Sequence, residues 1–252
     1  MGMSRTTQTR AYRQRIYDKY VSEKVKAEGV NNAERDYQRW SQAAKVRLRG
    51  WLPADRNTPV LDMGCGAGHF LYFMAQLGYT NLTGVDLSPE QVALARKWCP
   101  EAMIIQGDVR EVLARNPNHY GLIAGFDIIE HFGKDEILPF LELVAKAMKP
   151  GGRLILQTPN AESPWYGAVA YGDFTHEWFF TPASLQQLLR QVRLTGFEAR
   201  PSAPYIHGIK SLGRVVLWKT LNVLLTLWTI AESGSRGSGI YTRVFVATAV
   251  KQ

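Results

Sequence analysis

Short apolar runs alternate with amphipathic segments along the chain from about residue 59 to its end. The apolar runs predict strands at 59–63, 81–86, 102–106, 121–128, 152–158, 196–203 and 240–250. Apolar positions at helical spacing predict helices near 67–77, 88–98, 134–148 and 181–193. Alternation of strands and helices is typical of a mainly parallel sheet with helices on both faces, so the predicted fold class is α/β.

The direction of the last strand is less clear from the pattern. The final apolar run follows the Gly/Ser-rich sequence ESGSRGSG at 232–239. A short connection between neighbouring strands favours an antiparallel final strand. The same segment could instead return the chain after a helix, so the pattern leaves both directions open.

The composition divides the chain into a basic beginning and a nearly neutral remainder. The protein has 252 residues, 46% of them hydrophobic, which suffices for one domain with a full core. Residues 1–50 read as polar and helical, and they hold 12 of the 30 Lys and Arg but only 5 of the 22 Asp and Glu. We predict a basic helical extension over 1–50 and a domain over 51–252. The extension is either a solvated helix or a surface for anionic lipid headgroups, a phosphate-bearing carrier or RNA.

The cysteines and the N-terminal sequence favour the cytoplasm. Cys65 lies inside a glycine loop, which argues against a structural disulfide with Cys99. The sequence has no Cys/His cluster with zinc spacing. No apolar stretch follows the basic N-terminal residues, as it would in a secretory signal.

The sequence VLDMGCGAGHF at 60–70 places Gly64, Gly66 and Gly68 directly after a predicted strand. A strand, a glycine loop and a helix start together form a nucleotide-sized pocket in open α/β sheets. The loop lacks the Lys and Ser/Thr of a phosphate-binding P-loop, and its G-x-G-x-G spacing differs from the dinucleotide pattern. Asp62 would repel a pyrophosphate but suits a ligand with an ammonium or sulfonium charge.

Acidic residues also follow the next three predicted strands. Asp86 ends the second strand, Asp108 ends the third beside Val109, and the sequence DIIEH at 127–131 follows the fourth. Each acid by itself could be a helix N-cap. Because the carboxyl ends of parallel strands meet at one sheet edge, where such folds bind ligands, the set predicts a binding site there.

The sequences VLDMGCGAG, GVDLS, GDV, DIIEH and MKPGG occur in the order found in class I S-adenosylmethionine-dependent methyltransferases, and the chain resembles that family over about 55–200 and the terminal strand. The resemblance implies a Rossmann-like, seven-stranded sheet whose last strand is antiparallel. It also implies S-adenosylmethionine as the methyl donor. In that reading Asp62, Gly64, Cys65, Gly66 and Gly68 line its methionine end. Asp86 binds the ribose diol, Leu87 lies against the adenine, and Asp108 and Val109 hold the adenine.

The segment 158–189 indicates which class of acceptor the protein methylates. It resembles O-methyltransferases of bacterial surface polysaccharide sugars and also ubiquinone-type O-methyltransferases. A sugar hydroxyl needs a base, and we expect His176 or His131 to supply it, with His176 favoured and Asp173 or Glu177 orienting it. For either histidine the alternative is a structural hydrogen bond. Aromatic rings in this segment could stack on a sugar, or some could instead be core under a lid: Trp165, Tyr166, Tyr171, Phe174 and Trp178.

The predicted function is transfer of a methyl group to a sugar hydroxyl of a bacterial surface polysaccharide or its precursor. The main alternative is ubiquinone-type phenol methylation with a divalent metal held by Asp127, Glu130 and His131, although Asp127 could simply end the strand while the other two shape the pocket. A second alternative is a non-catalytic adaptor that keeps the fold. The absence of an NPPY-type sequence after the fourth strand argues against nucleic-acid bases as acceptors.

The segment 211–232 predicts one long helix that is apolar around most of its circumference. Its length approaches that of a bilayer span. Arg214 and Lys219 argue against a span, and so does its position between two strands of one sheet. Three locations remain: a homodimer interface, the roof of the acceptor site, or the inner face of the cell membrane, where the acceptor could be lipid-linked.

Overall fold

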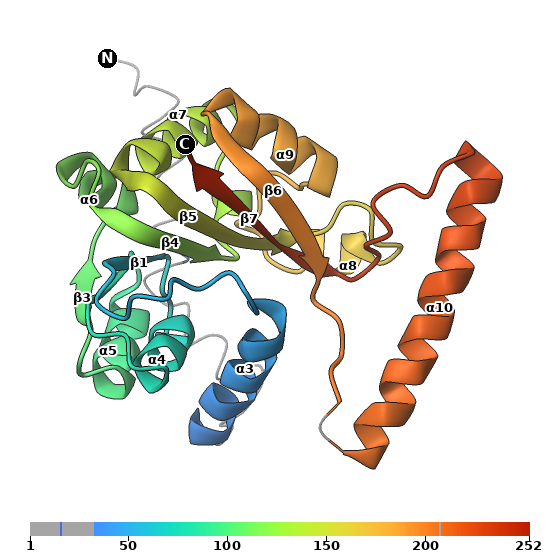
Figure 1. Ribbon diagram of the computed structural model, residues 1–252, viewed down its shortest axis with the longest axis horizontal. Coiled ribbons are helices and arrows are strands. Elements are labelled where there is room, and N and C mark those ends of the chain that lie inside the picture. The colour runs from blue at the N-terminus through green and yellow to red at the C-terminus, as the bar shows by residue number, and fades with distance from the viewer. Residues whose placement is uncertain (1–15, 17–32, 207) are drawn as a thin grey trace.

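The computed structural model describes residue 16 and residues 33–206 and 208–252, and its centre is one seven-stranded sheet (Figure 1). The strand order is β3-β2-β1-β4-β5-β7-β6, in which β7 runs antiparallel to both of its neighbours. The strands are β1 (Val60–Met63), β2 (Leu82–Asp86), β3 (Met103–Gln106), β4 (Tyr120–Phe126), β5 (Met148–Pro159), β6 (Leu194–Pro201) and β7 (Val244–Lys251). The predicted fold class and the antiparallel final strand are confirmed.

Helices cover both faces of the sheet, each over its own apolar cluster (Figure 1). The described helices are α3 (Ala33–Arg47), α4 (His69–Gln76), α5 (Pro89–Trp98), α6 (Val109–Arg115), α7 (Lys134–Ala147), α8 (Tyr166–Ala170), α9 (Pro182–Gln191) and α10 (Ile209–Ser233), with a 3-10 turn, η1, at Ile129–His131. Leu113, Phe140 and Leu189 anchor α6, α7 and α9 on one face. Phe70 and Val92 anchor α4 and α5 on the other. The short helices α6 and α8 are not predicted from the sequence.

The described part of the basic extension packs against the domain. In α3, the Tyr37 ring stacks on His69 at a centroid distance of 4.2 Å, and its hydroxyl donates to the carbonyl of Ala67. After the helix, the Trp51 indole is buried and donates to Glu198 of β6 at 3.0 Å. Residues 1–15 and 17–32 of the extension lie outside the described residues, and the boundary at residue 50 stays a prediction.

The glycine loop between β1 and α4 depends on backbone conformations that favour glycine. Gly66 has φ +52° and Gly68 has φ +88°, both in the left-handed region. A Cβ on Gly68 would lie 2.9 Å from the Cys99 sulfur of α5, so the loop and that helix approach closely. This approach holds the start of α4 at the edge of the sheet.

The predicted apolar helix at 211–232 forms α10, which connects β6 to β7 and stands beside the sheet (Figure 1). Among the described residues, α10 is the one helix whose length and composition would allow it to cross a membrane. Its most apolar stretch has a mean hydropathy of 1.3, and 6% of that stretch is buried in the protein.

Candidate active site

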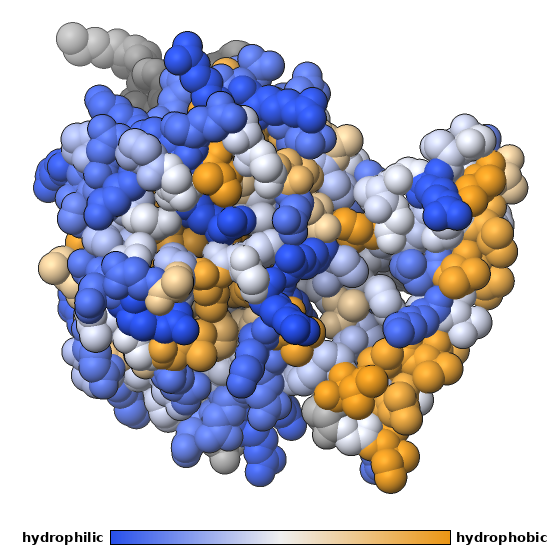
Figure 2. Space-filling view, in the orientation of Figure 1, coloured by the Kyte–Doolittle hydropathy of each residue, from blue (hydrophilic) through white to orange (hydrophobic). Residues whose placement is uncertain are grey.

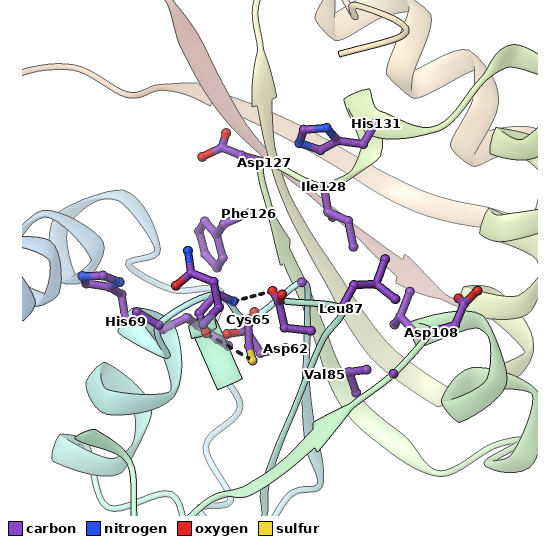
Figure 3. Close-up of a pocket in the computed structure, with 18 of the residues that line it drawn as sticks. Asp62, Cys65, His69, Val85, Leu87, Asp108, Phe126, Asp127, Ile128 and His131 are labelled. Carbon is purple, nitrogen blue, oxygen red and sulfur yellow. Dashed lines mark hydrogen bonds between the residues drawn. The ribbon is translucent and has the colours of Figure 1, made fainter. Parts of the chain in front are cut away.

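A cavity of about 570 Å³ opens at the carboxyl ends of β1, β2, β3 and β4 (Figure 3). This volume is in the range of small-molecule sites. The residues that line it are Trp40, Asp62, Gly64, Cys65, Gly66, Ala67, His69, Phe70, Val85, Asp86, Leu87, Gln91, Gly107, Asp108, Val109, Arg110, Phe126, Asp127, Ile128, His131, Phe132 and Glu136. Eight of the nine predicted cofactor-binding residues are among them.

Asp62 and Asp86 lie at one end of the cavity beside the glycine loop. Asp86 accepts hydrogen bonds from the backbone N–H groups of Gly66 and Ser88, each at 2.8 Å. Each carboxylate oxygen has a second lone pair, so Asp86 can still accept from a ribose diol. Asp62 is only 2% exposed, and its burial and then the charge of Asp86 raise its pKa well above the ordinary value. A cationic ligand beside Asp62 would offset that penalty.

An apolar surface for a base lies next to this acidic end. Val85, Leu87 and Val109 line it, and Leu87 is exposed toward it. Asp108, which is predicted to bind the adenine, caps α6 through the N–H of Arg110 and pairs with the Arg110 guanidinium at 2.6 Å. An adenine amino group would therefore share this carboxylate with Arg110.

Gly68 and Cys65 support the loop in different ways. Gly68 is not among the described residues that line the cavity, and its left-handed backbone gives it a conformational role in the loop; its contact with the methionine end stays a prediction. Cys65 lines the cavity but is buried, and burial raises the pKa of its thiol. Since the thiolate is the reactive form, Cys65 is suited to packing rather than nucleophilic attack.

Several aromatic residues of the cavity are missed by the sequence reasoning, among them Trp40 and His69. Trp40 of α3 packs on Phe126 at the end of β4, with ring centroids 5.2 Å apart. His69 lines the cavity from the start of α4. The apolar spacing of Tyr37, Trp40 and Ala44 is a signal that α3 buries one face, but it does not reveal what that face covers.

His131 lies at the far end of the cavity from Asp62, beyond Ile128 (Figure 3). Its Nδ1 is 2.9 Å from the hydroxyl of Thr175, and that hydroxyl donates to Asp173 at 2.6 Å. A threonine hydroxyl has one proton, and Thr175 donates it to Asp173. Nδ1 of His131 must therefore be protonated and donate to the Thr175 hydroxyl oxygen. The neutral imidazole then has its basic nitrogen at Nε2.

Asp173 is the charged end of this chain of side chains. Burial pushes its pKa upward, but hydrogen bonds from Thr175 and the nearby imidazoles of His131 and His176 outweigh burial and hold the pKa below its ordinary value. Asp173 is therefore ionised at neutral pH and can stabilise a positive charge on His131. The sequence assigned Asp173 to His176, whereas the contacts through Thr175 connect it to His131.

His176 lies next to His131, with ring centroids 4.9 Å apart, and its Nδ1 is 3.3 Å from the carbonyl of Ala170. Among the described residues, the cavity lining includes His131 but not His176, the base favoured from the sequence. Glu177, the alternative orienting residue, contributes a backbone N–H to the carbonyl of Glu130 at 2.8 Å.

The structure groups other residues around a possible metal than the alternative considered from the sequence, Asp127, Glu130 and His131. The ligand atoms of Glu130, His131 and His176 lie within 4.8 Å of one another, and Asp127 does not belong to this group. Asp127 has φ +55°, and its carboxylate accepts instead from the amide of Gln157 at 2.9 Å. Glu130 is fully buried, and one of its oxygens has no hydrogen-bond partner. Two imidazoles and one carboxylate suit zinc or a similar transition metal better than magnesium.

The sheet order with an antiparallel β7, together with the glycine loop bonded to Asp86, defines the class I methyltransferase fold. The methyltransferase domain family matches residues 33–200, more than half of the chain, so the protein belongs to this family. The class identified from the sequence is thus confirmed.

Curated relatives are ubiquinone biosynthesis O-methyltransferases. The one from Vibrio parahaemolyticus is 30% identical over 151 residues, which is 54% of this chain and 63% of the relative. The one from Xanthomonas campestris pv. campestris is 31% identical over 165 residues, which is 59% of this chain and 66% of the relative. The match thus covers just under two thirds of each relative's length.

Among solved structures, a SAM-dependent methyltransferase from Archaeoglobus fulgidus is similar with a TM-score of 0.62 and 18% identity. The similarity covers 88% of this chain and all of that one. At this identity it supports the fold.

Proposed function

We propose that the protein transfers a methyl group from S-adenosylmethionine to a hydroxyl oxygen. The observation that carries this proposal is one cavity with two different ends. At one end are the glycine loop, Asp62 and Asp86, and at the other is His131 with its partners Thr175 and Asp173. Asp62 suits the cationic donor, Asp86 its ribose, and Leu87 and Val109 its adenine.

His131 is the proposed base. The sulfonium already activates the methyl group, so the protein mainly aligns donor and acceptor. A sugar hydroxyl still needs its proton removed as the oxygen attacks. Nε2 of His131 can accept this proton, and the ionised Asp173, acting through Thr175, stabilises the resulting imidazolium. His176, beside it, is then a neighbour that shapes the site.

The proposed acceptor is a sugar hydroxyl of a bacterial surface polysaccharide or its precursor. The segment that contacts His131 carries aromatic side chains that are exposed rather than part of the core, as sugar-stacking rings are: Trp165, Tyr166, Tyr171, Phe174 and Trp178. A phenol of the ubiquinone type is the second candidate, favoured by the names of the curated relatives.

The two buried free thiols fit a reducing cytoplasm as the site of the reaction.

Methyl transfer from labelled S-adenosylmethionine tests this function. The acceptors are fractionated lipid-linked glycans, nucleotide sugars and a catechol of the ubiquinone type. Label in the glycan or nucleotide-sugar fraction that resists mild base, as an ether does, supports the sugar proposal. Label only in the catechol supports the phenol candidate, and label in neither contradicts both.

The base has its own test. His131→Ala is expected to lower kcat by roughly 10²–10⁴-fold, with donor affinity in calorimetry unchanged. His176→Ala is the matched control and is expected to cost much less. The assignment is wrong if His131→Ala keeps near-normal turnover.

The alternative to a histidine base is a divalent metal bound by residues of the same site. Glu130, His131 and His176 would hold it, and it would lower the pKa of the acceptor hydroxyl. The proposed base needs no metal, so we expect activity to survive exhaustive EDTA treatment. Loss of activity that zinc or magnesium restores would favour the metal.

A further inference from the structure

The polarity of α10 is inverted relative to an ordinary surface helix. The positions least exposed to solvent are Ser211, Val215, Trp218, Asn222, Leu225, Thr226 and Thr229, which recur at helical spacing and define its inner face. Most of these are polar or bear a polar group, and Thr229 lies 3.0 Å from the hydroxyl of Tyr241. A soluble protein places the apolar stripe of a helix inward, so packing on this chain does not explain the composition of α10.

The opposite side of α10 is an exposed apolar face. Its side chains are Ile209, Leu212, Val216, Leu217, Leu221, Val223, Leu224, Leu227, Trp228 and Ile230. Figure 2 shows hydrophobic residues gathered along the outer edge of α10 and around its lower end. Contiguous apolar patches of this kind mark contact with another protein or with a membrane.

The connections of α10 argue against a crossing. β6 ends at Pro201, which pairs with Phe245 at the start of β7, so both ends of the connection begin at one edge of one sheet. A single span would leave residues 234–243 to return through the bilayer as irregular backbone, which lipid does not tolerate. The helix can therefore lie along a surface but not across a bilayer.

The charges of α10 indicate which surface it fits. It has three basic residues, Lys210, Arg214 and Lys219, and one acidic residue, Glu232. At about 100° per residue, Arg214 and Lys219 fall on opposite margins of the apolar face. Cations at these margins can reach lipid headgroups while the apolar side chains enter the acyl region. If a second copy of the chain covered this face, two equally basic helices would lie against each other, and their charges would repel.

We propose that α10 is a membrane-surface helix whose apolar face enters the interface of an anionic bilayer while its inner face stays toward the protein. The sequence of residues 1–32 adds seven Lys and Arg against three Asp and Glu, which strengthens attraction to anionic lipid. This location places the methyltransferase domain beside acceptors that are themselves held by lipid. The inference does not depend on which acceptor is methylated.

Flotation of the full chain with vesicles tests the proposal. We expect binding to phosphatidylcholine vesicles with about one third phosphatidylglycerol, and weaker binding to pure phosphatidylcholine or at high salt. Leu217→Glu combined with Leu224→Glu changes side chains that are 61% and 56% exposed, so the fold is not disturbed. This variant is expected to lower the partition coefficient at least about tenfold.

A charge-matched control separates insertion from net charge. Met103→Glu combined with Val46→Glu alters side chains of similar exposure, 64% and 55%, outside α10. The control should float like the parent, and both variants should bind S-adenosylhomocysteine with the parent's affinity. The proposal is overturned if the parent does not float at low salt, or if the α10 variant floats as well as the control. It is also overturned if the parent is a dimer that the α10 variant dissociates without either form binding vesicles.

Discussion

The carboxyl group of Asp62 connects donor binding to pH. Burial and the neighbouring Asp86 raise its pKa, so below that value the empty site holds Asp62 protonated. A cationic donor favours the carboxylate, and binding in that range must release a proton. We expect the affinity for S-adenosylmethionine to rise with pH until the raised pKa of Asp62 is passed, which calorimetry in buffers of different ionisation enthalpy can measure.

Asp62→Asn is the control for this linkage. The variant should bind the donor more weakly, and the pH slope and the proton release should both disappear. If Asp62→Asn keeps the slope of the parent, another group causes it. If the parent shows no slope, the predicted linkage is wrong.

Thr175 is a positioning residue because it connects His131 to Asp173 through one hydroxyl. Thr175→Val keeps the shape and removes that connection. We expect kcat to fall by about 10- to 100-fold, less than the loss of the base itself, with little change in the donor's Kd. Thr175→Ser retains the hydroxyl and should restore most of kcat. Equal turnover in the Val and Ser variants would remove Thr175 from the mechanism.

The glycine loop sets the spacing between β1, α4 and α5. Gly66 and Gly68 both have positive φ, but a Cβ on Gly66 would make only ordinary contact with Gln91 at 3.9 Å, whereas a Cβ on Gly68 would lie 2.9 Å from the Cys99 sulfur. A left-handed alanine costs roughly 1–2 kcal/mol. We expect urea unfolding to show about that loss for Gly66→Ala and a clearly larger loss, about 2–4 kcal/mol, for Gly68→Ala. Equal losses would mean that α5 moves away without cost.

The strands and the longer helices could be predicted from the sequence, whereas the shortest helices could not. The strands are visible as apolar runs, and α4, α5, α7, α9 and α10 carry enough residues for a helical periodicity. The helix α6 has seven residues and α8 has five, fewer than two turns, so their patterns resemble loops. For α10 the sequence predicted a helix that is apolar around most of its circumference, but only the structure shows that Ser211, Asn222 and Thr229 face the protein.

In the molecule as a whole, the donor half of the site was predictable and the acceptor half was less so. Asp62 and Asp86 follow from the rule that parallel strands end at one edge. Trp40 depends on how α3 docks, a contact between residues far apart in the sequence. The position of Asp127 could not be predicted either: it has a positive φ, and its carboxylate accepts from Gln157, outside the group that Glu130 and His131 form with His176.

We expect this cavity to bind S-adenosylmethionine through the strand-end acids, of which Asp86 is the residue that would hold the ribose. Calorimetry with S-adenosylhomocysteine should give one site on the parent and no binding of NAD. Loss of the ribose hydrogen bonds in Asp86→Ala should cost about 1.5–3 kcal/mol, or about 10- to 150-fold in Kd, with the fold intact by circular dichroism. Unchanged affinity in Asp86→Ala, or tight binding of NAD to the parent, would contradict binding of S-adenosylmethionine through Asp86.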